Sequence, residues 1–512
     1  MSLPQRPNIL FIMADQMRFD CLGAVNPLIK TPNLDRLAAR GTLVSHAYPP
    51  TPVCLPCRAS MVTGQYPSSH GAMHNMAALP EDHKISLGAI FAAAGYYTHF
   101  VGKSHLTPCH ADPLSKETYP HIWNREWWRA FKGPWYGYEH ADLAIGHTVE
   151  DHAHGMHYGA WLVEQGVDIS RHFGNHEYTD FGVWDLPLEY HNSVWTADRA
   201  IAGIDAARAQ GQPFLSWVNF QDPHNPCLVP EPYASMYDPQ AIPEFGYKPG
   251  EPECFASKPP HYRDLSDQPG AYAAKPSDPN LDAMGNVCHL DWNSEQIQGN
   301  AACYYGMVTL LDEQVGRILD HLEATGQADN TLIVFTADHG DLLGDHGLWF
   351  KSLVAYDESI RVPFIVSWPG QVAEGVRSSA LLNLVDLFPS FCHAAGLPVP
   401  HLCEGVNQLP VWAGTQESAR DICVVEERPH SGPWLMRVVM DGTWKLVHYA
   451  NRDYGELYHH RDDPHHLHNL WGDPAHAQTQ QRLTLALLNH ELLKRGPNPN
   501  ATGFIAAGRT HA

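Results

Sequence analysis

The sequence predicts an α/β fold, in which a large and mostly parallel sheet is sandwiched by helices and followed by a smaller C-terminal α+β subdomain. Two observations predict this fold. Between residues 8 and 337, short apolar segments alternate with helical segments, and this alternation is typical of parallel sheets. From about residue 419, short strands follow one another at hairpin spacing. The expected domains are an α/β domain at 1–415, a small antiparallel sheet plus helix at 416–495, and a tail at 496–512.

The first predicted strand is the apolar run Asn8–Ala14, which is bounded by polar residues. A continuous apolar run is expected of a strand that is buried on both faces. A helix is predicted at 31–41, because Thr31 can cap its start, Pro32 suits its first turn and Gly41 suits its end. The other alternating elements are strands at 42–47, 96–102, 214–219 and 331–337, and helices at 86–94, 193–209 and 295–325.

Two long segments, 106–192 and 226–291, interrupt the alternation. The first is rich in aromatic and histidine side chains, and the second in Pro, Asp and Tyr. Long segments of this kind are usually functional loops or lids; the alternative is that they only cover the sheet or form a subunit contact. The C-terminal part is expected to contain strands at 422–425, 434–440 and 444–449 and a final helix at 479–494.

The composition excludes several classes of protein. The formal net charge is −23 and no dense Lys/Arg run occurs, which argues against a nucleic-acid partner. No segment reaches the roughly 18 apolar residues of a membrane helix, so no membrane association is expected. No N-terminal signal peptide is visible, and the 11 cysteines show no disulfide-like spacing. We therefore expect a protein of the reducing cytoplasm.

Two predicted strands end in a polar pair that suits a divalent cation. Asp15-Gln16 follows the first strand and Asp338-His339 follows the strand at 331–337. Ligands bind at the carboxyl ends of strands in open α/β sheets, so the two pairs can converge. Together they supply three oxygens and one imidazole, which suit a metal ion. The pair Asp345-His346 does not end a strand and ranks lower.

A third motif surrounds Cys54. Pro56 suits a first helical turn and Gly64 suits the end of that helix, so Cys54 is expected just before a helix N-terminus, where anions are favoured. Arg58 is placed to point back toward Cys54. The alternatives for Cys54 and Cys57 are a redox dithiol, half of a zinc ribbon, and a pair of buried structural cysteines.

This motif, Cys54-Leu55-Pro56-Cys57-Arg58, resembles the Cys-x-Pro-x-Arg signature of the sulfatases, which belong to the alkaline phosphatase superfamily. In that family the cysteine is converted to formylglycine, an aldehyde that hydrates to a geminal diol. The signature points to Cys54, because Cys57 lacks the Pro and Arg spacing. The resemblance also includes Asp15-Gln16, Gly102-Lys103-Ser104-His105, Asp222-Pro223-His224, Asp338-His339-Gly340 and Lys351. It implies an alkaline-phosphatase-like fold.

The resemblance assigns a role to each matching residue. The metal ligands would be Asp15, Gln16, Cys54, Asp338 and His339. Arg58 and Lys103 would steady the diol, and His105 would take a proton from its second hydroxyl as sulfate is expelled. His224 and Lys351 would bind the sulfate and protonate the leaving alcohol. Asn75 matches a substrate-contacting asparagine of some members.

The spacing of one pair carries a geometric expectation. Lys103 and His105 are two residues apart, so in an extended chain they are expected to face the same side.

The chain also departs from the family pattern. Many sulfatases have paired aspartates after the first strand and Asp-Asn after the later one, where this chain has Gln16 and His339. Calcium is the expected cation, and manganese and magnesium are the alternatives. The same two variants occur in phosphonate monoester hydrolases, which lack counterparts of Lys103 and His105. The expected reaction is hydrolysis of sulfate monoesters, in the manner of arylsulfatases. The alternative is a phosphonate monoester or phosphodiester hydrolase, and either activity can accompany the other.

The implied partners are a small-molecule sulfate ester and a formylglycine-generating or anaerobic maturation enzyme. A homo-oligomer, dimer or tetramer, is expected, with the tail at 496–512 as an exchange arm. The aromatic stretch at 123–138 fits an aryl, sugar or choline ester, or simply a core. A phosphoryl transferase of the same fold would use Thr or Ser as nucleophile, often with membrane helices. A non-catalytic sulfate-binding protein is disfavoured, because no catalytic position is lost.

Overall fold

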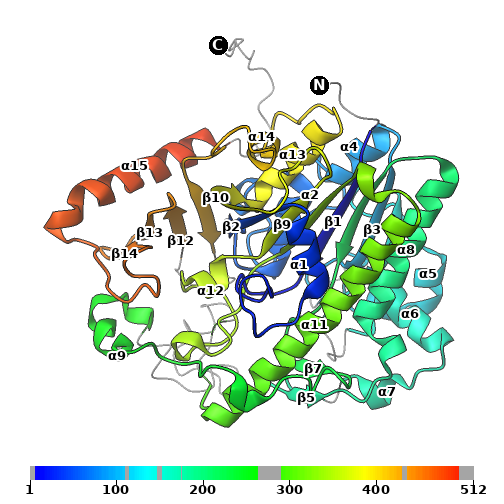
Figure 1. The fold of residues 1–512 in the computed structure, drawn as a ribbon, viewed down its shortest axis with the longest axis horizontal. Coiled ribbons are helices and arrows are strands. Elements are labelled where there is room, and N and C mark those ends of the chain that lie inside the picture. The colour runs from blue at the N-terminus through cyan, green and yellow to red at the C-terminus, as the bar shows by residue number, and fades with distance from the viewer. Residues whose placement is uncertain are drawn as a thin grey trace.

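The computed structural model describes residues 6–109, 115–146, 153–174, 176–262, 287, 290–428 and 435–494. Its centre is an eight-stranded sheet (Figure 1) with the strand order β10-β2-β9-β8-β1-β6-β3-β4. All neighbours are parallel except β9, which runs antiparallel to β2 and β8. The strands are β1 (Asn8–Ala14), β2 (Thr42–Tyr48), β3 (Tyr97–Lys103), β4 (His140–Ala144), β6 (Phe214–Asn219), β8 (Thr331–Ala337), β9 (Phe364–Ser367) and β10 (Val376–Asn383). The predicted fold class is confirmed.

Strand β1 lies in the middle of the large sheet and is buried along its whole length. Ile9 pairs with Leu215 of β6 on one side and with Leu332 of β8 on the other. Because helices cover both faces of the sheet, every side chain of β1 is buried in the core. This explains why the strand is an unbroken apolar run and was predicted with the correct bounds.

Helices cover both faces of the large sheet. In Figure 1, α1 (Pro32–Ala39), α8 (Asn192–Gln210) and α11 (Ser294–Ala324) run across the near face. Behind the sheet lie α2 (Cys54–Thr63), α4 (Leu87–Ala93) and α13 (Leu387–Ala394). None of the described helices is both long and apolar enough to cross a membrane.

The predicted cap of α1 is wrong. Thr31 makes no side-chain cap of the helix; its hydroxyl accepts from the Gly23 N–H at 2.7 Å. The buried carboxylate of Asp312, in α11, instead accepts from the Leu34 N–H at 2.8 Å. A partner from another helix thus satisfies the free N–H groups at the start of α1.

The first long insert completes the sheet. Strand β4, which the sequence did not predict, pairs in parallel with β3 at the sheet edge. Trp128 and Trp135, from the aromatic stretch of this insert, are fully buried in the core. For these two side chains the structure supports packing rather than direct contact with a ligand. The short elements of this region and elsewhere are α3 (Pro67–His70), α5 (Arg125–Ala130), α6 (Met156–Glu164), α7 (Ile169–His172), β5 (Phe181–Val183), β7 (Cys227–Val229), α9 (Glu251–Cys254), α12 (Asp357–Ile360) and α14 (Leu409–Trp412).

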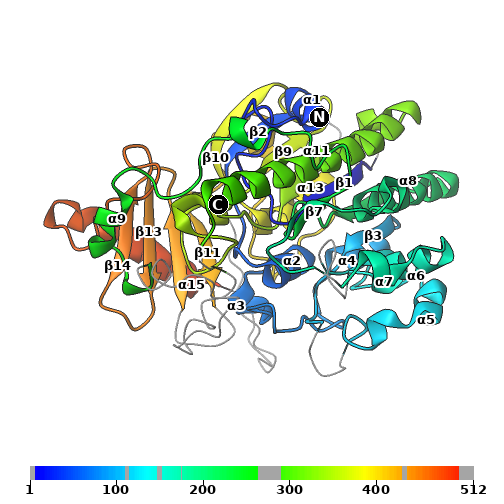
Figure 2. The same cartoon turned by 90° about the horizontal axis from the view of Figure 1, so that it is seen from below.

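The C-terminal part forms a second, four-stranded antiparallel sheet at one end of the molecule (Figure 2). Its elements are β11 (Cys423–Glu427), β12 (Met436–Met440), β13 (Trp444–Tyr449), β14 (Gly455–His459) and the helix α15 (Ala477–Leu493). Strand β14 was not predicted. One face packs on α15, and the other packs against residues of β2, β10 and α12. Trp434, the predicted start of the second strand, and the predicted tail at 496–512 lie outside the described residues.

Candidate active site

The carboxyl ends of β1 and β8 bring their polar pairs together. The two strands are adjacent and parallel, and Ala14 pairs with Ala337 immediately before Asp15 and Asp338. The backbone N–H of Gln16 donates to Asp338 Oδ1 at 3.1 Å. Asp15, Asp338, His339 and Cys54 each offer one ligand atom, and these four atoms lie within 4.8 Å of one another. Strand topology therefore creates a compact buried group of metal-ligating atoms.

Helix α2 delivers Cys54 to this group. The helix begins at Cys54 rather than after it, so Pro56 is its third residue and the expected position just before the helix is wrong by one residue. The helix ends at Gly64, which has φ 67°. The side-chain oxygen of Asn75 accepts from the Leu55 N–H at 3.1 Å. Asn75 therefore provides a hydrogen-bond acceptor for one of the free backbone N–H groups in the first turn of α2.

The Cys54 thiol is surrounded by polar groups. Its Sγ lies 3.0 Å from His339 Nε2 and 3.7 Å from Asp15 Oδ1. Lys351 Nζ donates to the same sulfur at 3.3 Å. The Cys54 residue is only 1% exposed, so these contacts are made without competing water.

Arg58 joins the ends of β1 and β8 through hydrogen bonds to both of their aspartates. Its Nε donates to Asp338 Oδ2 at 2.9 Å, and its Nη2 donates to Asp15 Oδ2 at 3.2 Å. Its Nη1 donates to the Lys103 carbonyl and to Asn219 Oδ1, both at 3.0 Å. The guanidinium is completely buried, and its rigid fork fixes two carboxylates at once.

The charge of Asp15 is maintained by its neighbours. Burial alone would raise the pKa of Asp15, but neighbouring positive charges, that of Lys103 foremost, hold it well below the usual range. The Lys103 ammonium forms an ion pair with Asp15 Oδ2. The carboxylate is therefore ionised at neutral pH, as a metal ligand must be.

Two histidines present the same ring nitrogen to the site. His339 Nδ1 lies 2.9 Å from the Gly340 carbonyl, and His224 Nδ1 lies 2.6 Å from the Asn225 carbonyl. A carbonyl can only accept, so each Nδ1 carries a hydrogen, and in the neutral ring each Nε2 presents a lone pair. Burial, and then the charge of Lys351, lower the pKa of His339 to about 4. His339 is thus neutral and able to bind a cation.

Lys351 lies at the junction of the metal-ligating group and the His224 turn. Its Nζ lies 2.8 Å from His224 Nε2 and also donates to Gln16 Oε1. Because the His224 Nε2 presents a lone pair, Lys351 is the donor in that contact. All three side chains are buried. The structure therefore places the Lys351 ammonium in contact with His224, Gln16 and the sulfur of Cys54.

The extended-chain argument for Lys103 and His105 is wrong. Lys103 is the last residue of β3, and His105 has φ 52°, which is left-handed backbone rather than extended. The chain therefore turns between them. The following N–H, of Leu106, donates to the buried carboxylate of Glu117 at 2.9 Å. Burial raises the pKa of Glu117 to about 7.

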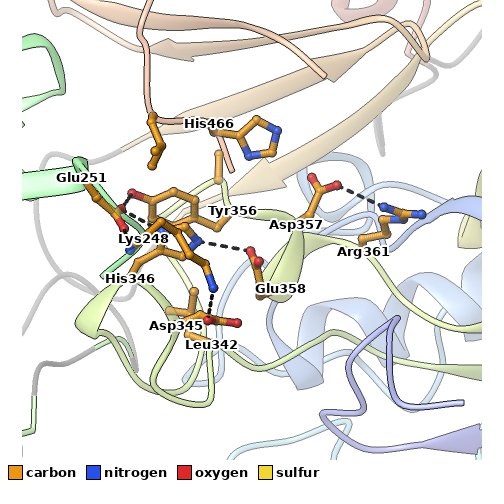
Figure 3. Close-up of polar contacts among 12 residues, drawn as sticks. Lys248, Glu251, Leu342, Asp345, His346, Tyr356, Asp357, Glu358, Arg361 and His466 are labelled. Carbon is orange, nitrogen blue, oxygen red and sulfur yellow. Dashed lines mark hydrogen bonds and ion pairs between the residues drawn. The ribbon is translucent and has the colours of Figure 1, made fainter. Parts of the chain in front are cut away.

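The lower-ranked pair Asp345-His346 belongs to a separate buried network (Figure 3). Asp345 Oδ2 lies 2.9 Å from Arg18, and Lys248 contacts the other oxygen. The His346 ring lies between Glu251 and Glu358 and stacks on Tyr356 with the ring centroids 3.5 Å apart. These ion pairs connect the second insert to the turn that leads to Lys351.

Comparison with known proteins places this site in a family. A model described as Sulfatase matches residues 7–397. The chain belongs to the sulfatase family. A second model, described as N-sulphoglucosamine sulphohydrolase, C-terminal, matches residues 344–492. The first match covers more than half of the chain and includes every candidate site residue, so this sulfatase is a sulfuric ester hydrolase of the alkaline phosphatase superfamily.

The similar proteins include both an arylsulfatase and a phosphonate monoester hydrolase. An arylsulfatase of Clostridium perfringens is 28% identical, over 91% of this chain and 90% of its own. The multifunctional alkaline phosphatase superfamily protein PehA of Trinickia caryophylli is 29% identical over 92% of both chains. The structure of a phosphonate monoester hydrolase from Silicibacter pomeroyi matches with a TM-score of 0.78 and 26% identity, covering 99% of each chain.

Sequence reasoning missed several residues that shape the site of this sulfatase. Asn219, at the end of β6, receives Arg58, and Asp341 and Asn225 both accept from the Gln16 amide. Each of these residues follows directly on a strand end or on a motif already noticed. The available signal was the presence of several polar residues in the sequence at or soon after the end of a buried strand.

Proposed function

We propose that this sulfatase hydrolyses sulfate monoesters, in the manner of arylsulfatases, with a formylglycine formed from Cys54 and one divalent cation. The observation that carries the proposal is the position of the Cys54 side chain. It lies at the first residue of α2, within 3.7 Å of Asp15, His339 and Lys351 atoms. A nucleophile made at this atom would lie beside both metal-ligating groups and the Lys351 ammonium.

The residues present fit a divalent cation. Asp15 and Asp338 supply carboxylate oxygens, and neutral His339 supplies the Nε2 lone pair. Gln16 would add its amide oxygen, and the modified side chain at position 54 would complete the set. A bound cation would lower the pKa of a diol hydroxyl and polarise the sulfuryl oxygens. Calcium is our first choice, because most of the ligand atoms are oxygens. The smaller number of negative ligands leaves room for manganese, and magnesium is a further alternative.

Arg58 and Lys103 support the proposed site through its carboxylates. The nitrogens of Arg58 donate to Asp15, Asp338, Asn219 and a backbone carbonyl. Its contacts therefore position the ligand oxygens rather than the nucleophile. We assign Lys103 the same role toward Asp15. His105 remains our proposed base for the second diol hydroxyl.

Lys351 and His224 also support the proposal. The Lys351 ammonium would neutralise the sulfate, because it already faces Sγ at 3.3 Å. His224 Nε2 accepts from Lys351 at 2.8 Å, and that contact is a path by which a proton can reach the leaving alcohol. Asn75 would contact the substrate near the start of α2. Proton donation to the leaving group is typical general acid catalysis.

The decisive experiment is the mass of the peptide that carries residue 54. Trypsin releases residues 41–58 as one peptide. Enzyme that is active on 4-nitrophenyl sulfate should show the mass change of replacing CH2SH by CHO in this peptide. Fully active enzyme with an unmodified thiol at residue 54 would overturn the proposal.

A second candidate function is phosphonate monoester or phosphodiester hydrolysis. The structural likeness to the Silicibacter pomeroyi enzyme favours it, and these substrates share the single negative charge of a sulfate monoester. The specificity constants for 4-nitrophenyl sulfate and 4-nitrophenyl phenylphosphonate, measured on one preparation, separate the two candidates. A far higher value for the phosphonate ester would make the second candidate the main activity.

We also propose a maturation enzyme that converts Cys54, a cytoplasmic location and a homo-oligomeric state. The ten cysteines in the described part of the chain are all free, which supports a reducing compartment. Size-exclusion chromatography with light scattering, on the full chain and on a variant ending at Lys494, tests the oligomer and the predicted exchange arm together. The domain limits at 415 and 495 also stay predictions.

A further inference from the structure

The side-chain amide of Gln16 is held at both of its polar atoms. Its Nε2 donates to Asn225 Oδ1 at 2.8 Å and also to Asp341 Oδ2. Its Oε1 accepts from Lys351 Nζ. A flipped amide would turn its NH2 group toward an ammonium and its oxygen toward two acceptors. Only one orientation therefore satisfies the surroundings.

In this orientation the carbonyl oxygen shares a donor with a member of the metal-ligating group. Lys351, which donates to Gln16 Oε1, also donates to Cys54 Sγ at 3.3 Å. The backbone N–H of Gln16 is tied to Asp338 Oδ1 at 3.1 Å. An amide oxygen is a metal ligand and an amide NH2 is not. The orientation of Gln16 thus decides whether the residue can serve the site.

The two groups that hold the amide are themselves fixed. Asp341 Oδ1 accepts from the Leu343 N–H at 2.6 Å, so each oxygen of this carboxylate faces an N–H donor. Asn225 Nδ2 donates to the Tyr178 carbonyl at 3.1 Å, which orients its Oδ1 toward Gln16. Asp341 and Asn225 come from the turns after Asp338-His339 and Asp222-Pro223-His224.

We propose that Asp341 and Asn225 are positioning residues, which hold the Gln16 carbonyl oxygen toward the divalent cation. The inference rests on the cation site of the proposed function and adds two residues beyond its ligands. Partners of this kind orient ligands, and changing them typically costs roughly 10- to 100-fold in metal affinity. An asparagine at 341 cannot satisfy both N–H donors, because one of its two side-chain atoms is itself a donor.

Asp341→Asn is the first test variant, and Asp312→Asn is its matched control. Asp312 is also a buried carboxylate with both oxygens on N–H donors, from Leu34 at 2.8 Å and Asn33 at 2.9 Å, but it lies between α1 and α11. Chelator-stripped full-length protein is titrated with Ca²⁺ or with Mn²⁺ in a calorimeter. We expect a roughly 10- to 100-fold weaker affinity in Asp341→Asn and an unchanged affinity in Asp312→Asn.

A reciprocal pair of variants tests the orientation itself. Gln16→Glu places a carboxylate against Asp341, which repels it. Adding Asp341→Asn to that variant replaces the repulsion by an N–H donor. The same Asp341→Asn substitution should therefore weaken cation binding in the natural background and strengthen it in the Gln16→Glu background. This reversal of sign measures coupling between the two side chains, whatever each change does to stability.

The outcomes separate this inference from the proposed function. Equal cation affinities in Asp341→Asn and the natural protein would overturn the inference and leave the proposed function standing. A natural protein that binds neither of these cations, nor Mg²⁺ in the same titration, would overturn the cation site and the inference together. If Asp341→Asn alone does not fold, the Gln16→Glu pair gives the answer, and the absence of any gain in affinity there overturns the inference.

Discussion

His346 Nδ1 and Glu251 Oε1 lie 2.7 Å apart, although the two residues are 95 positions apart in the chain. The contact is buried, and it ties the second insert to the turn that leads to Lys351 (Figure 3). Burial alone would lower the pKa of His346, but hydrogen bonds and charge from Glu251 and Glu358 raise it above its usual value. The folded protein therefore holds this proton more tightly than the unfolded chain does.

This proton makes stability depend on pH in a definite direction. The contribution of His346 is fully present below its unfolded pKa of about 6.5. It is lost as the pH rises through the raised folded pKa, because the unfolded chain releases the proton first. We expect the free energy of unfolding to fall over this range, and to fall less in His346→Gln. Urea unfolding at several pH values measures both slopes, and parallel slopes would contradict the assignment.

Removal of Arg58 should destabilise the fold strongly. Arg58→Met leaves the carboxylates of Asp15 and Asp338 buried without their shared partner, which typically costs about 3–5 kcal/mol. The surface pair of Arg36 and Asp320 is the control, because its side chains are 33% and 64% exposed, and Arg36→Met should cost less than about 1 kcal/mol. Urea unfolding of chelator-treated protein compares the two. Similar costs would mean that Arg58 is not the link between the strand ends.

Cys57 should be dispensable for activity. Burial raises the pKa of its thiol well above the usual value, so it stays protonated and unreactive. We expect Cys57→Ala to retain the modified residue 54 and most of the activity on 4-nitrophenyl sulfate, and Cys54→Ala to abolish that activity. Peptide mass and initial rates measure the two effects. A Cys57→Ala enzyme that is folded but unmodified would show that the maturation step reads this position too.

The loss of His224 should depend on the leaving group. A proton donor matters most when the departing alkoxide is basic, and general acid catalysis contributes roughly 10²–10⁴-fold. We expect His224→Ala to lower kcat/KM for phenyl sulfate far more than for 4-nitrophenyl sulfate. Lys351→Met should lower both, because its charge faces the sulfate. Equal losses on the two esters in His224→Ala would remove His224 from the proton path.

Three central strands were predictable, because a strand that is buried on both faces is mostly apolar in sequence. β1, β6 and β8 are mostly apolar and fully buried, and they were placed with correct bounds. The edge strands β4 and β10 were missed, and so was the central strand β9, which has only four residues. β10 begins with exposed and mostly polar residues. It has a neighbouring strand on one side only, and its buried residues come near its end. An edge strand therefore lacks the pattern that identifies a central one.

The candidate site was predictable where a motif ends a strand, and unpredictable where contacts are distant. Asp15 and Asp338 follow apolar runs and could be placed at one sheet edge. Asn219 receives Arg58 across 161 positions of sequence, and no local pattern signals such a contact. The left-handed backbone of His105 was also unforeseen, because no glycine or asparagine occupies that position.

The order of the chain has a consequence for when the Cys54 side chain can be reached. Its partners His339 and Lys351 come 285 and 297 positions later, and β1 cannot be flanked on both sides until β8 exists. During synthesis, residue 54 therefore leaves the ribosome long before the segments that bury it in the folded protein are synthesised. A folded chain exposes 1% of this residue. Access for any modifying enzyme is thus a matter of timing, and slower translation of residues 55–351 would widen the interval available to it.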